Sequence, residues 1–124
     1  MKRRRIVQCL LACAVLIATI GCASMNAPQP VNFSTPYQAV LLGNNSVYFG
    51  KLSGYGTPNP VLTDVFYIVT QTDQQTKQVK NILVKRGKEL HGPDRMYLNP
   101  GQIVFVEPVG TDSKVAQLIA EAGK

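Results

Sequence analysis

The sequence predicts a mainly β domain, a small and strongly bent five-stranded barrel followed by one C-terminal helix. Three observations predict it. Between residues 37 and 110, runs rich in Val, Ile, Phe and Tyr alternate with turns rich in Gly, Asn and Pro, as is typical of short strands. Gly50 lies inside one of these runs and indicates sharp curvature or a close backbone approach. A helical period follows near the C-terminus.

The first half of the domain predicts three strands. Residues 37–42 and 46–53 form a hairpin, because the Gly43-Asn44-Asn45-Ser46 segment between them tolerates positive φ. Residues 54–60 predict a loop, since they hold two glycines and two prolines. Residues 61–70 predict a third strand, and their apolar content on both faces places it centrally in the sheet.

The second half predicts the remaining strands. Residues 71–78 form a polar hairpin loop, and residues 79–85 form the fourth strand. A loop rich in Gly and charge covers residues 86–95. The last strands are expected around the Pro100-Gly101 turn, over residues 96–98 and 102–107.

The C-terminal segment, residues 112–122, predicts an amphipathic helix. Thr111 or Asp112 is expected to cap its start, and Gly123 follows its end. Its apolar residues share one face, which is expected to pack on the sheet: Val115, Leu118, Ile119 and Ala122.

The N-terminus is typical of an export signal. Residues 2–5, Lys-Arg-Arg-Arg, precede the uncharged residues 6–20. A signal helix of that length would span about 23 Å, short of the ~30 Å hydrocarbon core of a membrane. The length therefore favours a signal segment over a permanent span.

The end of this run, Ala18-Thr19-Ile20-Gly21-Cys22, resembles the lipobox of bacterial lipoproteins. The resemblance implies a signal peptide over 1–21, cleavage after Gly21, and fatty modification of Cys22. Thr19 departs from the Leu favoured there, and an uncleaved anchor with an incidental cysteine is the alternative. Ala23 is not the Asp of an inner-membrane retention signal, which in a Gram-negative cell favours an outer-membrane lipoprotein facing the periplasm over one in the inner membrane.

Residues 22–36 predict a flexible linker that carries the lipidated Cys22. Three prolines and several polar residues favour an extended spacer. In the alternative, Val31 and Phe33 pack onto the edge of the domain, which spans residues 37–124.

Charge and cysteine content exclude several function classes. Beyond Cys22 there are nine Lys and Arg residues against seven Asp and Glu residues, a net charge of about +2. A strongly basic nucleic-acid-binding domain is therefore not expected. All three cysteines precede residue 23, which excludes a disulfide framework or thiolate metal site in the domain. No cofactor or metal is expected.

Two segments resemble the Sm-like family, whose fold is an SH3-like barrel. They are Leu41-Leu-Gly-Asn-Asn-Ser-Val-Tyr-Phe-Gly-Lys-Leu with Val61-Leu-Thr-Asp, and the looser Leu98-Asn-Pro-Gly-Gln-Ile-Val-Phe-Val. The resemblance implies the barrel fold. It does not carry RNA binding, because the 54–59 loop lacks the family's Asp and the 99–101 turn lacks its Arg.

A closer resemblance is to a group of short uncharacterised bacterial proteins, and it implies no known activity. The similar segments are Val47-Tyr-Phe-Gly-Lys-Leu, Leu62-Thr-Asp, Leu83-Val-Lys and Glu89-Leu-His-Gly-Pro.

Few residues are candidates for chemistry, and no enzyme is predicted. No nucleophile-elbow or phosphate-loop motif occurs. His91 with Asp94 and Arg95 could form a proton-transfer or metal pair, although a loop held by hydrogen bonds is favoured. Asp64 is expected to accept backbone N–H bonds from a neighbouring turn and to fix strand geometry, with a functional carboxylate as the alternative.

The tyrosines Tyr48, Tyr55, Tyr67 and Tyr97 are candidates for an interaction surface, because Tyr combines a large contact area with a polar end. The leading hypothesis is a non-enzymatic envelope lipoprotein, held at the membrane by its lipid, whose barrel binds a protein partner or itself. The alternative is a module that binds a ligand or peptidoglycan.

Overall fold

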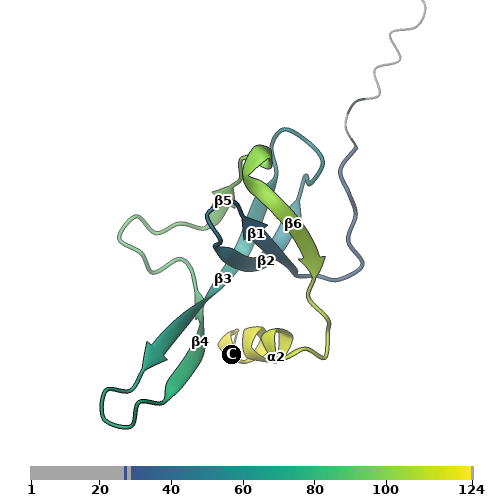
Figure 1. Ribbon diagram of the computed structural model, residues 1–124. Helices are drawn as coiled ribbons and strands as arrows, with labels where there is room; N and C mark the ends of the chain where they lie inside the picture. Colours follow the sequence, from purple (N-terminus) through teal and green to yellow (C-terminus); the bar gives the residue numbers. More distant parts are fainter. Residues whose placement is uncertain (1–26, 28, 124) are drawn as a thin grey trace, which may run out of the picture.

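The computed structural model of the protein describes residues 27 and 29–123. The predicted signal helix over 1–21 and the lipidation site at Cys22 lie outside the described residues. Within them the domain is mainly β, as predicted, with one C-terminal helix (Figure 1). The strands are β1 (Gln38–Leu42), β2 (Val47–Ser53), β3 (Val61–Thr72), β4 (Val79–Lys85), β5 (Arg95–Tyr97) and β6 (Ile103–Pro108), and the helix is α2 (Lys114–Ala122).

The strands form one antiparallel sheet with the order β4-β3-β2-β1-β6, and β5 pairs with the first part of β3. The described residues form six strands close to the six expected segments, but the prediction that they build a five-stranded barrel is wrong, since all six belong to one sheet and that sheet is open. A short 3-10 helix, η1 (Pro100–Gln102), explains the difference. It carries the chain from β5 on one side of the sheet to β6 on the other, and these two strands do not pair.

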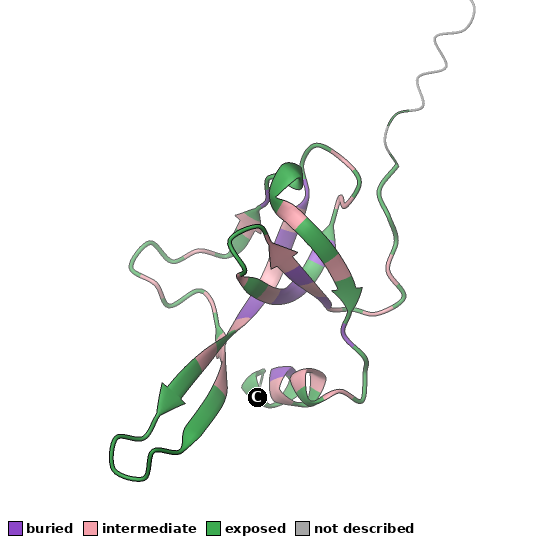
Figure 2. Ribbon diagram, viewed as in Figure 1, coloured by how far each residue is buried: buried purple, intermediate pink, exposed green. Residues whose placement is uncertain are grey.

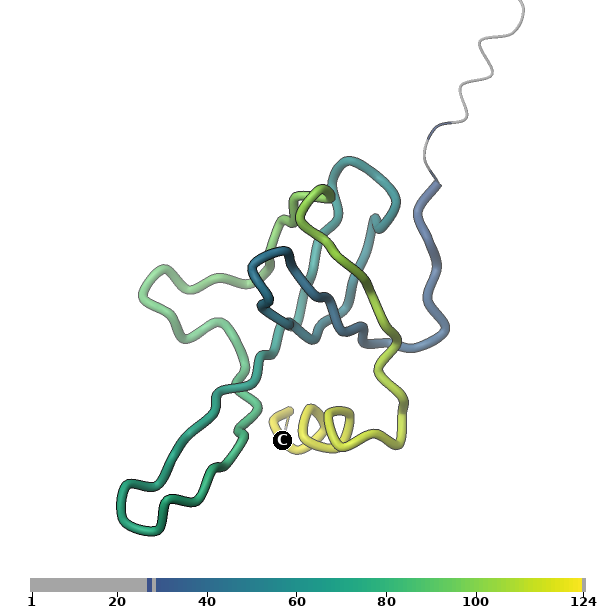
Figure 3. The backbone as a smooth tube through the Cα atoms, viewed as in Figure 1, coloured from purple at the N-terminus to yellow at the C-terminus, as the bar shows by residue number. Residues whose placement is uncertain are grey.

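β3 pairs with both β5 and β4 along its length because it bends near Asp64. Residues 61–63 pair with β5, whereas residues 66–72 pair with β4. Asp64 itself has a φ of 50°, a left-handed conformation that is uncommon outside glycine. β3 is thus central, as predicted, and its bend sends the β3–β4 hairpin away from the rest of the sheet (Figures 1 and 3).

β2 curves at Gly50, as the sequence predicted. The register between β2 and β3 shifts between Phe49 and Lys51. A Cβ placed at Gly50 would lie 2.8 Å from both the Leu62 Cγ and the Thr63 carbonyl oxygen. The absence of a side chain therefore lets the two strands approach where the sheet bends.

The core has two parts, and Figure 2 shows buried residues in purple on the strands, on α2 and on the segment between β6 and α2. One lies among the strands and is made of Val40, Leu52, Leu62, Val65 and Leu98. The other lies between the sheet and α2 and is made of Phe49, Phe66, Val109 and Ile119.

α2 begins two residues later than predicted. Its cap is Ser113, whose hydroxyl accepts a hydrogen bond from the Ala116 N–H, rather than Thr111 or Asp112. Residues 110–113 form a turn of their own, closed by a bond from the Ser113 N–H to the Gly110 carbonyl. Thr111 and Asp112 therefore lie in this turn, and the helix begins after it.

The end of the predicted linker contacts the domain. The Val31 N–H donates to the Tyr55 carbonyl at 2.8 Å, and the rings of Phe33 and Tyr55 lie 5.9 Å apart. The alternative in which Val31 and Phe33 contact the domain is therefore the arrangement in the structure. Among the described residues, no helix has the length and apolar character needed to cross a membrane.

Candidate functional site

The Asp64 carboxylate is in contact with side chains from three other parts of the sheet. The hydroxyl of Tyr37, just before β1, donates a hydrogen bond to its carboxylate. The Lys85 Nζ of β4 lies 2.8 Å from Asp64 Oδ1, and the Lys51 Nζ of β2 lies 3.7 Å from Oδ2. The expectation that Asp64 accepts backbone N–H bonds is wrong: in the described structure its partners are side chains. Its bent backbone turns the carboxylate toward residues distant in sequence.

This environment changes two pKa values. Burial raises the pKa of the Asp64 carboxyl, but hydrogen bonds from Lys85 and Tyr37 and the charges of Lys85 and Lys51 outweigh it, so the pKa is lowered. Burial, followed by the hydrogen bond to Asp64 and its charge, raises the pKa of the Tyr37 hydroxyl to about 12. The phenol therefore stays protonated and donates, which suits a structural contact rather than a general base.

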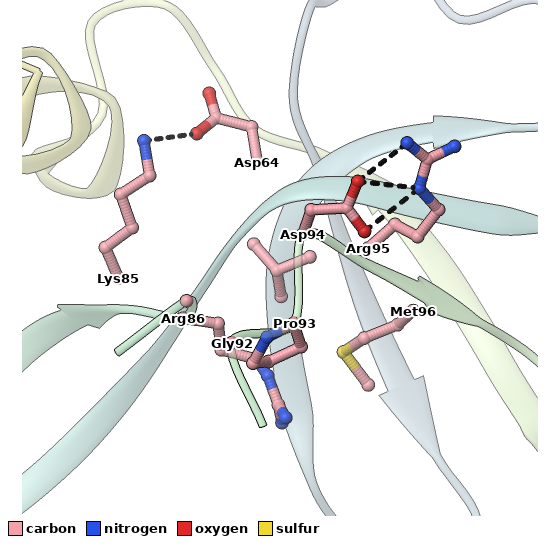
Figure 4. A pocket seen from close by; sticks show the side chains of 10 residues that line it. Asp64, Lys85, Arg86, Gly92, Pro93, Asp94, Arg95 and Met96 are labelled. Carbon is pink, nitrogen blue, oxygen red and sulfur yellow. Dashed lines mark hydrogen bonds and ion pairs between the residues drawn. The ribbon is translucent and has the colours of Figure 1, made fainter. Parts of the chain in front are cut away.

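A pocket of about 450 Å³ lies beside this cluster, between the 86–95 loop and the β3–β4 strands (Figure 4). Asp64 and Lys85 form one wall. Asp94 and Arg95, both predicted as loop-site residues, line another part of the pocket. The pocket's apolar lining comes from Val65, Pro93 and Met96.

The acids around the pocket are already paired. The Arg95 guanidinium binds Asp94 through Nε at 3.1 Å and through Nη2 at 2.7 Å, and this contact lowers the pKa of Asp94. Glu89 accepts the Gly87 N–H at 2.7 Å, which lowers the Glu89 pKa. Its other oxygen lies 3.3 Å from the Arg86 Nε.

His91 shares the loop with Asp94 and Arg95 but does not line the pocket. The structure thus brings Asp94 and Arg95 together without His91. No group of three His, Cys, Asp or Glu side chains in the described part of the chain is arranged to hold a metal ion.

The four predicted tyrosines do not form one surface. Tyr48 and Tyr67 are direct cross-strand neighbours with ring centroids 6.3 Å apart in an edge-on arrangement. Tyr55 packs against Phe33 instead. Tyr97 lies on β5, where 75% of its surface is exposed.

The two ends of the sheet carry exposed apolar side chains. β6 pairs with β1 on one side and with no other strand of the described chain. The register between β1 and β6 shifts between Leu41 and Leu42, so Val104 has no partner in the ladder. Val104 is 60% exposed and Phe105 44% exposed. At the other end, β5 pairs with β3 alone among these strands and exposes Tyr97.

Sequence reasoning did not find Tyr37, Lys51 and Lys85 as partners of Asp64. The two lysines could have been found from the charged residue within each of three apolar runs, since isolated charges in strands tend to pair, but the sequence gives no such signal for Tyr37. No protein-family model matches this chain, and no curated protein matches it either.

Proposed function

We propose that this chain is a lipid-anchored protein of the bacterial cell envelope whose domain associates with further copies of itself. The anchor rests on the lipobox-like segment that ends at Cys22 and on the export-type residues before it. Two or more acyl chains hold a protein stably at a membrane. The domain faces the periplasm from the outer membrane, because Ala23 is not the Asp of an inner-membrane retention signal.

One observation carries the self-association: the sheet is open, and exposed apolar side chains lie at both of its free ends. An unpaired edge strand presents backbone N–H and C=O groups to any strand that fits. β6 carries Val104 and Phe105 there, and its one charged residue is Glu107. The proposed occupant of this edge is β5 of a second copy, whose exposed Tyr97 supplies a matching aromatic surface.

β5 fits this role better than its neighbour β4. Both strands carry charge, but Arg95 of β5 is paired with Asp94, whereas Lys80 in the outer part of β4 has no ion pair among the described residues. An unpaired charge on an edge strand opposes pairing. Tyr97 offers apolar area with a hydroxyl that remains hydrated at an interface. Contact between unlike edges is head-to-tail, so it produces a ring or a chain of subunits rather than a closed two-fold dimer.

We also propose that the bent sheet is an open form of the SH3-like barrel that the Sm-like resemblance implies. The order of β5, η1 and β6, and the pairing of β1 with both β2 and β6, support this reading. The proposed role is structural rather than enzymatic. Nucleic acid is not the proposed ligand, because the part of the chain after Cys22 has a net charge of only about +2.

The test is sedimentation velocity on the full-length protein extracted from membranes in a mild detergent. We expect assemblies larger than one subunit that dissociate on dilution. Phe105→Lys should yield single subunits, because a charge would be desolvated at the interface. Val31→Lys is the matched control, because Val31 is 47% exposed and lies outside the sheet. A wild-type protein that sediments as one subunit at every concentration contradicts the proposal.

A further inference from the structure

We propose that the pocket beside Asp64 binds a small ligand through its oxyanion, a carboxylate or a phosphate, with Arg86 as the principal contact. Arg95 and Met96 of β5 belong to the lining of this pocket, but binding there does not require self-association.

The state of Arg86 is the first argument. Its side chain is 21% exposed and lines the pocket. The buried Nε makes no hydrogen bond within the described chain, because the Glu89 oxygen at 3.3 Å is poorly aligned with it. A guanidinium has five N–H donors, and a buried donor without a partner is costly. The buried Nε is closed to a ligand, but the terminal Nη1 and Nη2 groups are not fully buried and make no hydrogen bond within the described chain, so an oxyanion in the pocket would accept hydrogen bonds from them.

The balance of charge is the second argument. Four cations surround the pocket and its Asp64 wall: Lys51, Lys85, Arg86 and Arg95. Three carboxylates face them, namely Asp64, Glu89 and Asp94. Each of the three carboxylates already has a hydrogen-bond or ion-pair partner. With four cations against three carboxylates, a bound anion would experience a net charge of +1.

The position of Arg86 is fixed before any ligand arrives. Its backbone N–H donates to the Val65 carbonyl at 2.8 Å, and its guanidinium carbon lies 5.9 Å from the centre of the Tyr48 ring. A donor that is held in place loses little freedom on binding, which favours affinity.

The size and lining of the pocket define the rest of the ligand. About 450 Å³ exceeds the volume of a single carboxylate or phosphate. Val65, Pro93 and Met96 supply apolar surface beside the cations. The ligand is therefore a small amphiphile with one anionic end and a short apolar part.

The test uses hexanoate and hexyl phosphate as probes on the full-length protein, titrated by calorimetry against sodium chloride of equal ionic strength. We expect saturable binding of at least one probe, and the probe that binds identifies the anion as carboxylate or phosphate. Arg86→Gln should weaken that binding by about tenfold, the loss expected for a charge-assisted hydrogen bond. Lys88→Gln, in the same loop but outside the pocket lining, should bind as the wild type does.

A second measurement does not depend on any variant. The Arg86 Nε–H resonance of the wild-type protein should shift as the bound probe saturates the site. Absence of saturable binding by both probes overturns the proposal. Equal binding by Arg86→Gln, or an equal loss in Lys88→Gln, also overturns it, because the anion would then be held by general surface charge.

Discussion

The hydroxyl of Tyr37 donates a hydrogen bond to the carboxylate of Asp64, a residue 27 positions later in the chain. The contact ties the start of β1 to the bend of β3. Lys51 from β2 and Lys85 from β4 contact the same carboxylate. Four segments of the sheet therefore meet at the partly buried carboxylate of Asp64. This is the point at which β3 stops pairing with β5 and begins to pair with β4.

Asp64→Asn should destabilise the domain by about 1 to 2 kcal/mol, the loss of charge-assisted hydrogen bonds at a partly exposed site. Asn tolerates the left-handed backbone of residue 64, so the variant removes the charge without adding backbone strain. Urea unfolding followed by circular dichroism measures the change. Glu121→Gln, on the exposed end of α2, is the control and should have little effect. Equal stability of Asp64→Asn and wild type would show that the cluster contributes nothing to folding.

Acid should remove this contribution from the wild type. The pKa of Asp64 is lowered in the folded state, so its stabilisation is present above the unfolded pKa and is lost as the pH falls through the folded value. We expect the free energy of unfolding of wild type and Asp64→Asn to converge below about pH 4. A difference that stays constant down to acid pH would contradict this assignment.

Alkali should act on the same cluster through Tyr37. Its pKa is raised to about 12 from 10.0, so its contribution is complete below pH 10.0 and is lost as the pH approaches about 12. In a spectrophotometric titration of the phenolate, Tyr37 should ionise after the normal tyrosine range, and Tyr37→Phe should remove this late step. A late step that survives in Tyr37→Phe would assign it to another tyrosine.

Gly50→Ala should destabilise the domain by about 2 to 3 kcal/mol through overpacking, because the new Cβ meets the Thr63 carbonyl, which is backbone. Gly123→Ala is the matched control, since its added Cβ comes no closer than 3.7 Å to its neighbours. Thermal unfolding of both variants distinguishes the two sites. Similar melting temperatures for them would mean that β2 and β3 can separate at the bend without cost.

Local features of the fold could be predicted from the sequence. The hairpin turn at residues 43–46, the curvature at Gly50 and the C-terminal helix each follow from a few neighbouring residues. The partners of Asp64 could not be predicted, because Tyr37, Lys51 and Lys85 meet it only after the sheet has formed. The open sheet was missed for the same reason. Residues 95–108 contain two strands, and only the tertiary structure decides that they lie on opposite sides.

Mass spectrometry of the protein from its native host tests the anchor. We expect a mature chain that begins at Cys22 and carries diacylglycerol on sulfur, with further acylation of the amino group. Cys22→Ala should accumulate as the unprocessed precursor. An intact amino end at Met1 together with an unmodified Cys22 would contradict the lipoprotein assignment.

Cysteine crosslinking in intact membranes tests the self-association most directly. The domain has no cysteine of its own, so Tyr97→Cys and Phe105→Cys can be introduced together as its only thiols. Mild oxidation of the double variant should give a ladder of dimers, trimers and larger species, whereas either single variant gives dimers at most. A double variant that remains monomeric after oxidation would contradict the pairing of β5 with β6 of a second copy.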